Sequence, residues 1–169
     1  MKMTKDDALG FHCPRWEELP SISLYMDQVV IVVEEALGIF ADEKERVVTS
    51  TMINNYVKQK LISPPVKKRY ERRHIAFIIV VSVLKKVLSM QEIMGVMELM
   101  LKQYGMDAAY NMYCESLEAI LAAAFSKKSD AKTGGEEKPE VDVMNASIHA
   151  VTEKLYVQYF LSLKETETK

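Results

Sequence analysis

The sequence predicts an all-α fold, and three observations lead to this prediction. Apolar residues repeat at helical spacing in several segments of the chain. Residues that commonly cap helices precede these segments, and glycines or prolines follow them. The composition, with 49% hydrophobic and 27% charged residues over 169 positions, is that of a soluble globular protein. This length suggests one domain or slightly more and is sufficient to bury a core.

The chain begins with an N-terminal arm, expected over residues 1–20, and continues into the first long helix. Apolar residues recur at helical spacing over Leu24–Leu37. Ser21 or Ser23 is expected to cap the start of this helix, because a serine hydroxyl can accept a bond from a free backbone N–H. Gly38 is expected to end it.

A second, shorter helix is predicted over residues 50–60 and is followed by a break in regular structure. Thr49 or Ser50 is expected to cap its start. The prolines at positions 64–65 break the chain, because proline lacks the backbone N–H and fixes φ. The stretch over residues 62–70 is therefore expected to be extended and to allow a small β-hairpin.

Two further helices follow the prolines. Residues 72–88 contain a β-branched run that would also suit a buried strand, but their length and the lack of an internal turn signal favour a buried helix. Ser89 and Glu92 form a capping-box pattern that opens the next helix, and Gly105 is expected to end it.

The C-terminal part of the sequence predicts two helices and a linker. Asp107 is expected to cap a helix that extends to Phe125. Residues 126–142 are poor in apolar side chains and are typical of a flexible linker. A final amphipathic helix is predicted over residues 143–164. The chain thus divides into an arm at 1–20, a central unit at 21–104 and a helical C-terminal region at 105–169.

Several classes of protein are disfavoured by the composition. The two cysteines, Cys13 and Cys114, are too few for a disulfide framework or a zinc cage, so a reducing compartment is the default. The longest apolar run, residues 75–84, is shorter than the roughly 18 residues of a membrane span. The first residues lack the apolar centre of a signal peptide, and a cytoplasmic protein is expected. No phosphate loop, nucleophile elbow or metal-ligand spacing occurs, so neither a cofactor nor enzyme activity is expected.

Positive charge is concentrated in one window of the chain. Residues 49–73 carry seven basic and one acidic side chain, whereas residues 1–43 carry three basic and nine acidic side chains. The formal net charge of the whole chain is only −2. Such an asymmetry is informative about partners rather than about the fold, and it indicates a partner with negative charge.

The helix predicted over residues 50–60 has a polar face. At about 100° per residue, four polar side chains fall on a stripe about 100° wide, and the apolar side chains fall on the opposite side. Asparagine offers a donor and an acceptor together, which matches the N6/N7 edge of adenine, and threonine or lysine can also contact bases. A solvated face without a ligand would show the same stripe. The expected base-reading residues are Thr51, Asn54, Asn55 and Lys58.

A basic cluster follows the prolines, which stiffen the chain so that the cluster can project as a small wing. Each phosphate that a cation neutralises adds about 0.9 to the salt slope of binding to B-DNA. The alternative is a charged loop that serves solubility, although solubility does not require a single sign of charge. The expected phosphate contacts are Lys67, Lys68, Arg69, Arg72 and Arg73, with Tyr70 between them as an anchor on the core.

The order of these segments resembles the winged helix-turn-helix of MerR-type transcription regulators. The matching positions are Ile53, Tyr56, the step Lys60-Leu61-Ile62, the wing pair Arg69-Tyr70 and the closing cap LSMQEI at 88–93. The chain departs from that family in several places: the helix at Leu24–Leu37 is longer than the usual first helix, the link at 38–48 is longer than a tight turn, and Lys60 stands where a glycine is usual. The long dimerising helix of that family is replaced by shorter helices after residue 89.

The strings CPRWEELP, YMDQV and TSTMINNYVKQKLI also resemble a bacterial family called domain of unknown function 1836, over about residues 12–110. The MerR-type resemblance implies double-stranded DNA as the partner and transcriptional regulation as the function. The alternative is a protein-interaction module that keeps the helix-turn-helix shape without using it on DNA.

A methionine stripe lies in the helix that Ser89 opens. Met90, Met94, Met97 and Met100 recur at spacings of four, three and three residues. Such a stripe is most often core, but methionine also adapts to varied partners. Where part of it is exposed, we expect a dimer face or a pocket for an unknown small-molecule effector, formed with the helix at 107–125. A homodimer through the C-terminal helices is expected.

Overall fold

The computed structural model describes residues 3–41, 45–126 and 139–167, and these ranges contain seven α-helices and two short 3-10 helices. No β-strand occurs in these ranges, although isolated antiparallel bridges join Leu24 to Tyr70 and Val66 to Arg69. The all-α prediction is therefore confirmed. The helices are α1 Lys5–Leu9, η1 Trp16–Glu18, α2 Met26–Ala36, η2 Gly38–Phe40, α3 Ser50–Lys58, α4 Arg72–Leu84, α5 Met90–Tyr104, α6 Met106–Ser126 and α7 Pro139–Glu167.

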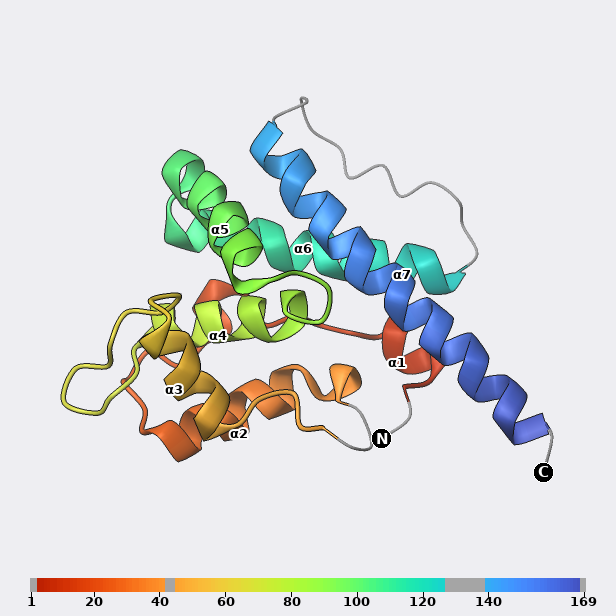
Figure 1. Cartoon of the computed structure of the whole chain (residues 1–169), viewed down its shortest axis with the longest axis horizontal. Coiled ribbons are helices and arrows are strands. Elements are labelled where there is room, and N and C mark those ends of the chain that lie inside the picture. The colour runs from red at the N-terminus through yellow and green to blue at the C-terminus, as the bar shows by residue number, and fades with distance from the viewer. Residues whose placement is uncertain (1–2, 42–44, 127–138, 168–169) are drawn as a thin grey trace.

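Helix α4 is the central element of the structure. Figure 1 shows α2 and α3 on one side of it and α5, α6 and α7 on the other, and α4 contacts α2, α6 and α7. Nine of its 13 residues are buried, as expected for a helix enclosed by others. The predicted buried helix is confirmed, but it ends at Leu84 rather than near residue 88. The backbone tightens there, because the N–H groups of Lys86 and Val87 bond to carbonyls three residues back.

Helix α2 begins later than the sequence predicts, and neither expected serine caps it. Leu24 and Tyr70 exchange two backbone hydrogen bonds of 2.8 Å, so Leu24 is held in an extended conformation. The helix therefore starts after Tyr25, whose backbone N–H donates to the side chain of Gln28 at 2.9 Å. The prediction of Ser21 or Ser23 as the N-cap is wrong, because a contact with a distant segment decides where the helix starts.

The start of α5 follows the local sequence. Ser89 and Glu92 form the predicted capping box, in which the Ser89 N–H donates to the Glu92 carboxylate at 2.7 Å and the Glu92 N–H donates to the Ser89 hydroxyl at 3.3 Å. Gly105, with φ of 76°, ends the helix in a conformation that favours glycine. Asp107 does not cap α6 as predicted, because α6 already begins at Met106 and Asp107 lies in its first turn.

Helix α7 is longer than the sequence predicts. It begins at Pro139, a residue well suited to a first helical position because the missing N–H has no partner there. The end of the predicted linker, residues 139–142, is therefore helical. The rest of that prediction, residues 127–138, lies outside the described residues.

The N-terminal arm is held on α6 by polar and aromatic contacts. The Arg15 guanidinium donates to both carboxylate oxygens of Glu118, at 2.6 and 2.8 Å. The rings of Trp16 and Tyr110 lie 6.3 Å apart, and the backbone N–H of Trp16 donates to the side-chain oxygen of Asn111 at 2.8 Å. Trp16 therefore docks the arm on the core.

The two cysteines also join the arm to α6, which the sequence does not predict. The Sγ atoms of Cys13 and Cys114 lie 3.2 Å apart as free, buried thiols. The hydrogen bond to Cys114, together with burial, raises the pKa of Cys13. Cys13 therefore remains protonated, and the two buried thiols pack as small apolar side chains in the core.

Candidate nucleic-acid interface

Helix α3 presents a polar face to solvent. Its four expected base-reading residues are all exposed, and none of them has a hydrogen-bond or ion-pair partner in the described part of the chain. Ile53 and Tyr56 on the opposite side are buried. The predicted division of this helix into a core face and a free face is therefore confirmed. The exposed residues are Thr51, Asn54, Asn55 and Lys58.

The buried side of α3 is fixed by contacts near its start and middle. The Met52 N–H donates to the Thr49 hydroxyl at 3.2 Å, so Thr49 is the N-cap. Burial raises the pKa of Tyr56 to about 12, and this phenol remains protonated. The Lys85 ammonium lies 5.9 Å from the Tyr56 ring centre and donates to the Val47 carbonyl at 3.1 Å. These contacts fix the buried side of α3 while its polar face stays free.

Helix α3 ends two residues earlier than predicted, at Lys58, and its end has the geometry of a Schellman motif. The N–H of Lys60 bonds to the carbonyl of Val57 at 3.0 Å, and the N–H of Leu61 bonds to the carbonyl of Tyr56 at 3.0 Å. Lys60 has φ of 61°, a left-handed conformation that favours glycine. Lys60, which stands where MerR-type regulators usually have glycine, thus occupies a position whose backbone conformation favours glycine.

The wing is a minimal β-hairpin with a cationic tip. Val66 and Arg69 exchange backbone hydrogen bonds of 3.1 and 2.9 Å across a two-residue loop. The loop residues, Lys67 and Lys68, have φ of 50° and 63°. Positive φ at both central positions defines a type I′ turn, for which Asn-Gly is strongly preferred. Both lysines are exposed, and neither has an ion-pair partner among the residues described.

The base of the wing is anchored on the start of α2. Arg69 lies 4.3 Å from the ring centre of Tyr25, donates to the Tyr25 hydroxyl at 2.9 Å and donates to the Ser23 carbonyl at 3.3 Å. Tyr70 is 3% exposed, and its backbone forms the bridge to Leu24. The expectation that Tyr70 anchors the loop is confirmed. Arg69, expected to contact phosphate, is engaged within the molecule.

The two arginines at the start of α4 also have partners within the chain. Arg72 pairs with Glu17 at 3.4 Å and lies 5.7 Å from the Trp16 ring centre, so the N-terminal arm covers part of it. Arg73 pairs with Glu71 at 3.0 Å, with both side chains half-exposed. An exposed pair such as that of Arg73 contributes little free energy. Arg73 is therefore the more accessible of the two arginines, whereas the Arg72 side chain is only 22% exposed.

His74 joins the wing to α4. The Glu71 N–H donates to Nδ1 of His74 at 2.8 Å, and Nε2 of His74 lies 3.1 Å from the Ser63 hydroxyl. Since a backbone N–H donates to Nδ1, that nitrogen is unprotonated and the proton of the neutral ring is on Nε2. Burial, aided by the charge of Arg73, lowers the pKa of His74, whereas Glu71 opposes this shift.

Helix α3 and the wing lie beside each other. Figure 1 shows the loop between α3 and α4 projecting beside α3, at the end of the molecule away from α7. The structure thus brings the exposed residues of α3 to the same end as Lys67 and Lys68. It draws Arg69, Arg72 and Arg73 into contacts at the base of the wing. Sequence reasoning missed Tyr25 as a support of this site, because its partner Arg69 is distant in the chain.

Other kinds of site find no support in the parts of the chain that the structure describes. No group of three or more histidine, cysteine, aspartate or glutamate side chains is placed there to hold a metal ion. None of the described helices is both long and apolar enough to span a membrane.

One comparison with known proteins gives a match. A protein-family model described as domain of unknown function (DUF1836) matches residues 14–113, which cover more than half of the chain and the whole of the candidate interface. Neither the curated proteins nor the solved structures include a significant match. The comparisons thus lend no support to the MerR-type resemblance, and the fold remains described as all-α.

Proposed function

We propose that this chain, which belongs to the family described as domain of unknown function (DUF1836), is a DNA-binding transcriptional regulator. In this proposal, α3 enters the major groove of double-stranded DNA, and the hairpin Val66–Arg69 acts as a wing on the phosphate backbone. The finer fold assignment that accompanies it is a winged helix-turn-helix of the MerR type. The role is one of binding, not of catalysis.

The tip of the wing is the observation that carries this proposal. Lys67 and Lys68 occupy left-handed positions where lysine costs about 1 kcal/mol more than glycine or asparagine. Neither side chain has an ion-pair partner among the residues that the structure describes. Strain without an internal contact indicates a function outside the molecule. Two neighbouring cations at the tip of a hydrogen-bonded turn are suited to the closely spaced phosphates of a duplex.

Helix α3 supplies the groups that would read the sequence. Asn54 and Asn55 each offer an amide that can bond to the N6/N7 edge of adenine, and neither amide is engaged within the molecule. Thr51 stands one turn earlier, where its methyl or hydroxyl group can contact thymine or a base edge. Lys58 at the end of the helix can reach guanine or a phosphate.

Selection of bound duplexes from a random DNA pool, at two salt concentrations, tests the proposal. We expect an enriched motif at both concentrations, and an affinity for non-specific DNA that falls steeply with salt. An enriched motif whose binding is lost in Asn55→Ala but kept in Gln103→Ala, at an exposed position on α5, would support α3 as the reader. Recovery of no motif, together with no salt-dependent binding, would refute a DNA partner.

A homodimer through the C-terminal helices is the second part of the proposal. A groove between α5 and α7 is lined by small and apolar side chains together with Glu92, Glu98 and Lys102, and Leu99 and Val143 in it are 47% and 40% exposed. Burial of such side chains against a second copy is favourable, and a two-fold dimer would bind two half-sites. The same groove favours the alternative, a protein-interaction module that does not bind DNA. Sedimentation of the wild type and of Leu99→Glu measures whether the groove forms a dimer, and the DNA assay on the same two proteins measures whether DNA is bound. Together they separate the DNA-binding dimer from the interaction module.

A further inference from the structure

Helices α5 and α7 lie side by side, on the side of α4 away from α3, and they run in opposite directions (Figure 1). The Tyr104 hydroxyl, at the end of α5, donates to the Glu140 carboxylate near the start of α7 at 3.2 Å. The Lys154 ammonium, farther along α7, donates to the carbonyl of Lys86, shortly before α5, at 2.8 Å. The groove between the two helices is therefore held by a polar bond at each end.

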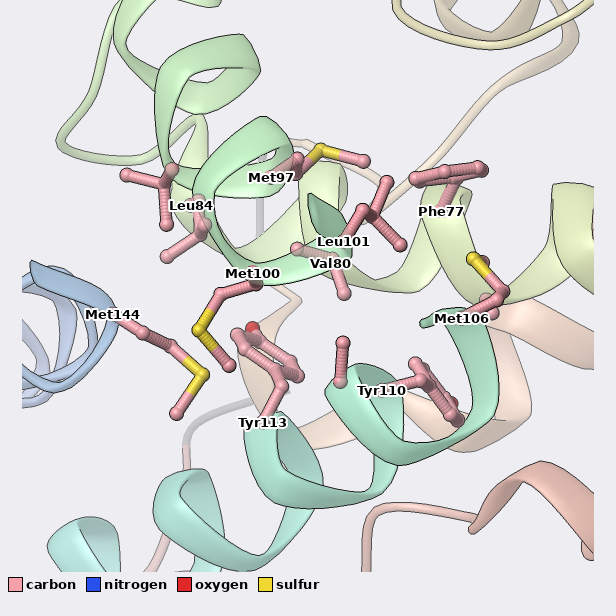
Figure 2. A pocket seen from close by; sticks show the side chains of 13 residues that line it. Phe77, Val80, Leu84, Met97, Met100, Leu101, Met106, Tyr110, Tyr113 and Met144 are labelled. Atoms are coloured by element: carbon pink, nitrogen blue, oxygen red, sulfur yellow. The ribbon is translucent and has the colours of Figure 1, made fainter. Parts of the chain in front are cut away.

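Helix α5 presents different faces to the core and to this groove. Figure 2 shows Met97, Met100 and Leu101 of α5 among the side chains that line a pocket between α4, α5, α6 and α7. The methionine stripe of α5 therefore packs on the core. The groove face of α5 carries exposed residues at spacings of three, four and three, which place them on one stripe of the helix. These residues are Glu92, Gly95, Leu99 and Lys102.

Gly95 is the residue of this stripe that packing within the chain does not explain. Glycine in the interior of a helix destabilises it relative to alanine. A Cβ atom at Gly95 would lie within 4 Å of no atom beyond its own turn of helix, so nothing in the described part of the chain requires the missing side chain. The space over Gly95 is open from outside, and a side chain of another molecule can approach the backbone there.

The stripe is complementary to itself when a second copy of α5 lies against it in the opposite direction. About a two-fold axis that passes α5 at the level of Met97, each residue faces the one equally far beyond that level. Leu99 then faces Gly95 of the second copy, so the large apolar side chain of the stripe enters its open space. Glu92 faces Lys102 of the second copy, so opposite charges meet. The symmetry makes both contacts twice, and the alternating spacing of three and four residues is that of paired helices.

Both charged residues of the stripe are available for these contacts. No ion pair joins Lys102 to any residue that the structure describes, including Glu98 one turn before it. Glu92 closes the capping box with Ser89, whose bonds lower the pKa of this carboxyl, so Glu92 is ionised and its oxygens can accept further bonds. A parallel pair would instead place Glu92 against Glu92 and Lys102 against Lys102, which is unfavourable.

We propose that the groove between α5 and α7 binds α5 of a second copy in the opposite direction, with Leu99 over Gly95 and Glu92 paired with Lys102. The exposed Val143 and Ala146 on α7 form the other wall of the groove, and the small alanine allows a close approach. Since few apolar side chains are buried, we expect a weak dimer with a dissociation constant of about 10 μM. This inference rests on the homodimer of the proposed function and assigns its contacts and direction. It does not depend on DNA binding.

Exchange of the charges tests the direction and the register, by sedimentation of the full-length protein without DNA. The wild type should be mostly dimeric at about 100 μM. Glu92→Lys and Lys102→Glu should each be monomeric there, because each variant places like charges opposite one another twice. A 1:1 mixture of the two variants should form a heterodimer, since both pairs of opposite charge are then restored. In a parallel pair, Glu92→Lys would only replace one repulsion by another and would not weaken the dimer.

Two controls exclude other causes of these changes. Ser89→Ala removes the hydroxyl of the capping box that Glu92→Lys also disrupts, but keeps the charges of the stripe, so it should remain dimeric. Glu35→Lys and Lys5→Glu change the net charge by the same amounts at exposed positions on α2 and α1, outside the groove, and each should remain dimeric.

Gly95→Ala tests the contact with Leu99 through two effects of opposite sign. It should raise the melting temperature of the dilute monomer by about 2 °C, because alanine favours a helix and meets no neighbour. It should also weaken the dimer about tenfold, because the added methyl group occupies the space that Leu99 enters. A dimer as tight as that of the wild type would overturn this contact.

The outcomes separate this inference from the proposal on which it rests. A wild type that is monomeric at about 100 μM would overturn the homodimer and this inference together. A dimer that Leu99→Glu dissociates but Glu92→Lys leaves unchanged would overturn only the direction and register assigned here. Two charge variants that stay monomeric when mixed would do the same. None of these measurements contains DNA, so none of them bears on the DNA proposal.

Discussion

Replacement of the wing tip, Lys67→Asn together with Lys68→Gly, separates the shape of the turn from its charge. Asn-Gly is the preferred pair for a type I′ turn, whereas lysine at positive φ is strained by about 1 kcal/mol per residue. Part of this gain is offset because glycine also increases the entropy of the unfolded chain. We therefore expect the free energy of unfolding to rise by about 1 kcal/mol, and the melting temperature to rise by about 2–4 °C.

The same variant should bind DNA less tightly. Loss of two phosphate contacts lowers the slope of log K against log salt by about 1.8, since each contact contributes about 0.9. Over the tenfold range from 1 M to 0.1 M salt, this difference amounts to a factor of about 60 in affinity. Fluorescence anisotropy of a labelled duplex over a salt series measures the slope, and calorimetry measures the melting temperature.

Two controls make the result interpretable. Lys67→Gln with Lys68→Gln removes the same charges without relieving the backbone strain of the turn. This variant should lower the salt slope as much as the Asn-Gly variant does, but its free energy of unfolding should not rise. Lys5→Gln with Lys102→Gln removes two exposed charges on α1 and α5, away from α3, and should change neither quantity. A more stable Asn-Gly variant with an unchanged salt slope would refute the phosphate role of the tip. An Asn-Gly variant whose free energy of unfolding equals that of the wild type would refute the backbone strain assigned to Lys67 and Lys68.

Three further predictions concern α3 and the base of the wing. Asn55→Ala should cost about 1–3 kcal/mol on a selected site and nothing on random DNA, by anisotropy; equal losses on both would remove its role in base reading. Lys60→Gly should raise the free energy of unfolding by about 1 kcal/mol in urea, because it relieves a left-handed residue. Lys58→Gly, inside the same helix, should lower it by about as much, and the same sign for both would contradict the assigned end of α3. The pKa of His74 is lower in the folded protein than in the unfolded chain, so His74 takes up a proton first in the unfolded chain as the pH falls. The contribution of His74 to the free energy of unfolding is therefore fully present above the unfolded pKa of about 6.5 and is lost as pH falls through the folded pKa. His74→Gln should flatten the melting temperature between about pH 5 and 6.5, since glutamine can accept the Glu71 N–H without titrating; a slope equal to that of the wild type would exclude His74 as its cause.

The elements that the sequence predicts well are those whose boundaries depend on neighbouring residues. Thr49 caps α3, and the Ser89–Glu92 capping box opens α5, because each bond joins residues three apart. The burial of α4 follows from its continuous apolar run. The exposure of the polar face of α3 follows from helical spacing and from the burial of the opposite side.

The elements that the sequence does not predict depend on residues far apart in the chain. The start of α2 is set by the bridge between Leu24 and Tyr70, which overrides the capping preference of the serines before it. The contact between Cys13 and Cys114 joins residues 101 positions apart. Arg69 looked like one of five equivalent cations, yet its contact with Tyr25 makes it a support for the hairpin. Spacing along a chain cannot reveal such pairs, because they exist only after the helices have packed.

The distribution of strain distinguishes two roles among the basic residues of the wing. Among the residues that the structure describes, the non-glycine residues with positive φ are Lys60, Lys67 and Lys68. All three lie between α3 and α4, and each stands where glycine or asparagine would relieve the backbone. The arginines, in contrast, have ordinary backbone conformations and partners within the chain. If solubility were the purpose of the cluster, cations at unstrained positions would serve as well. Positive charge at strained positions is therefore better explained by a ligand that requires it there, and the salt slope of the Asn-Gly variant measures that requirement directly.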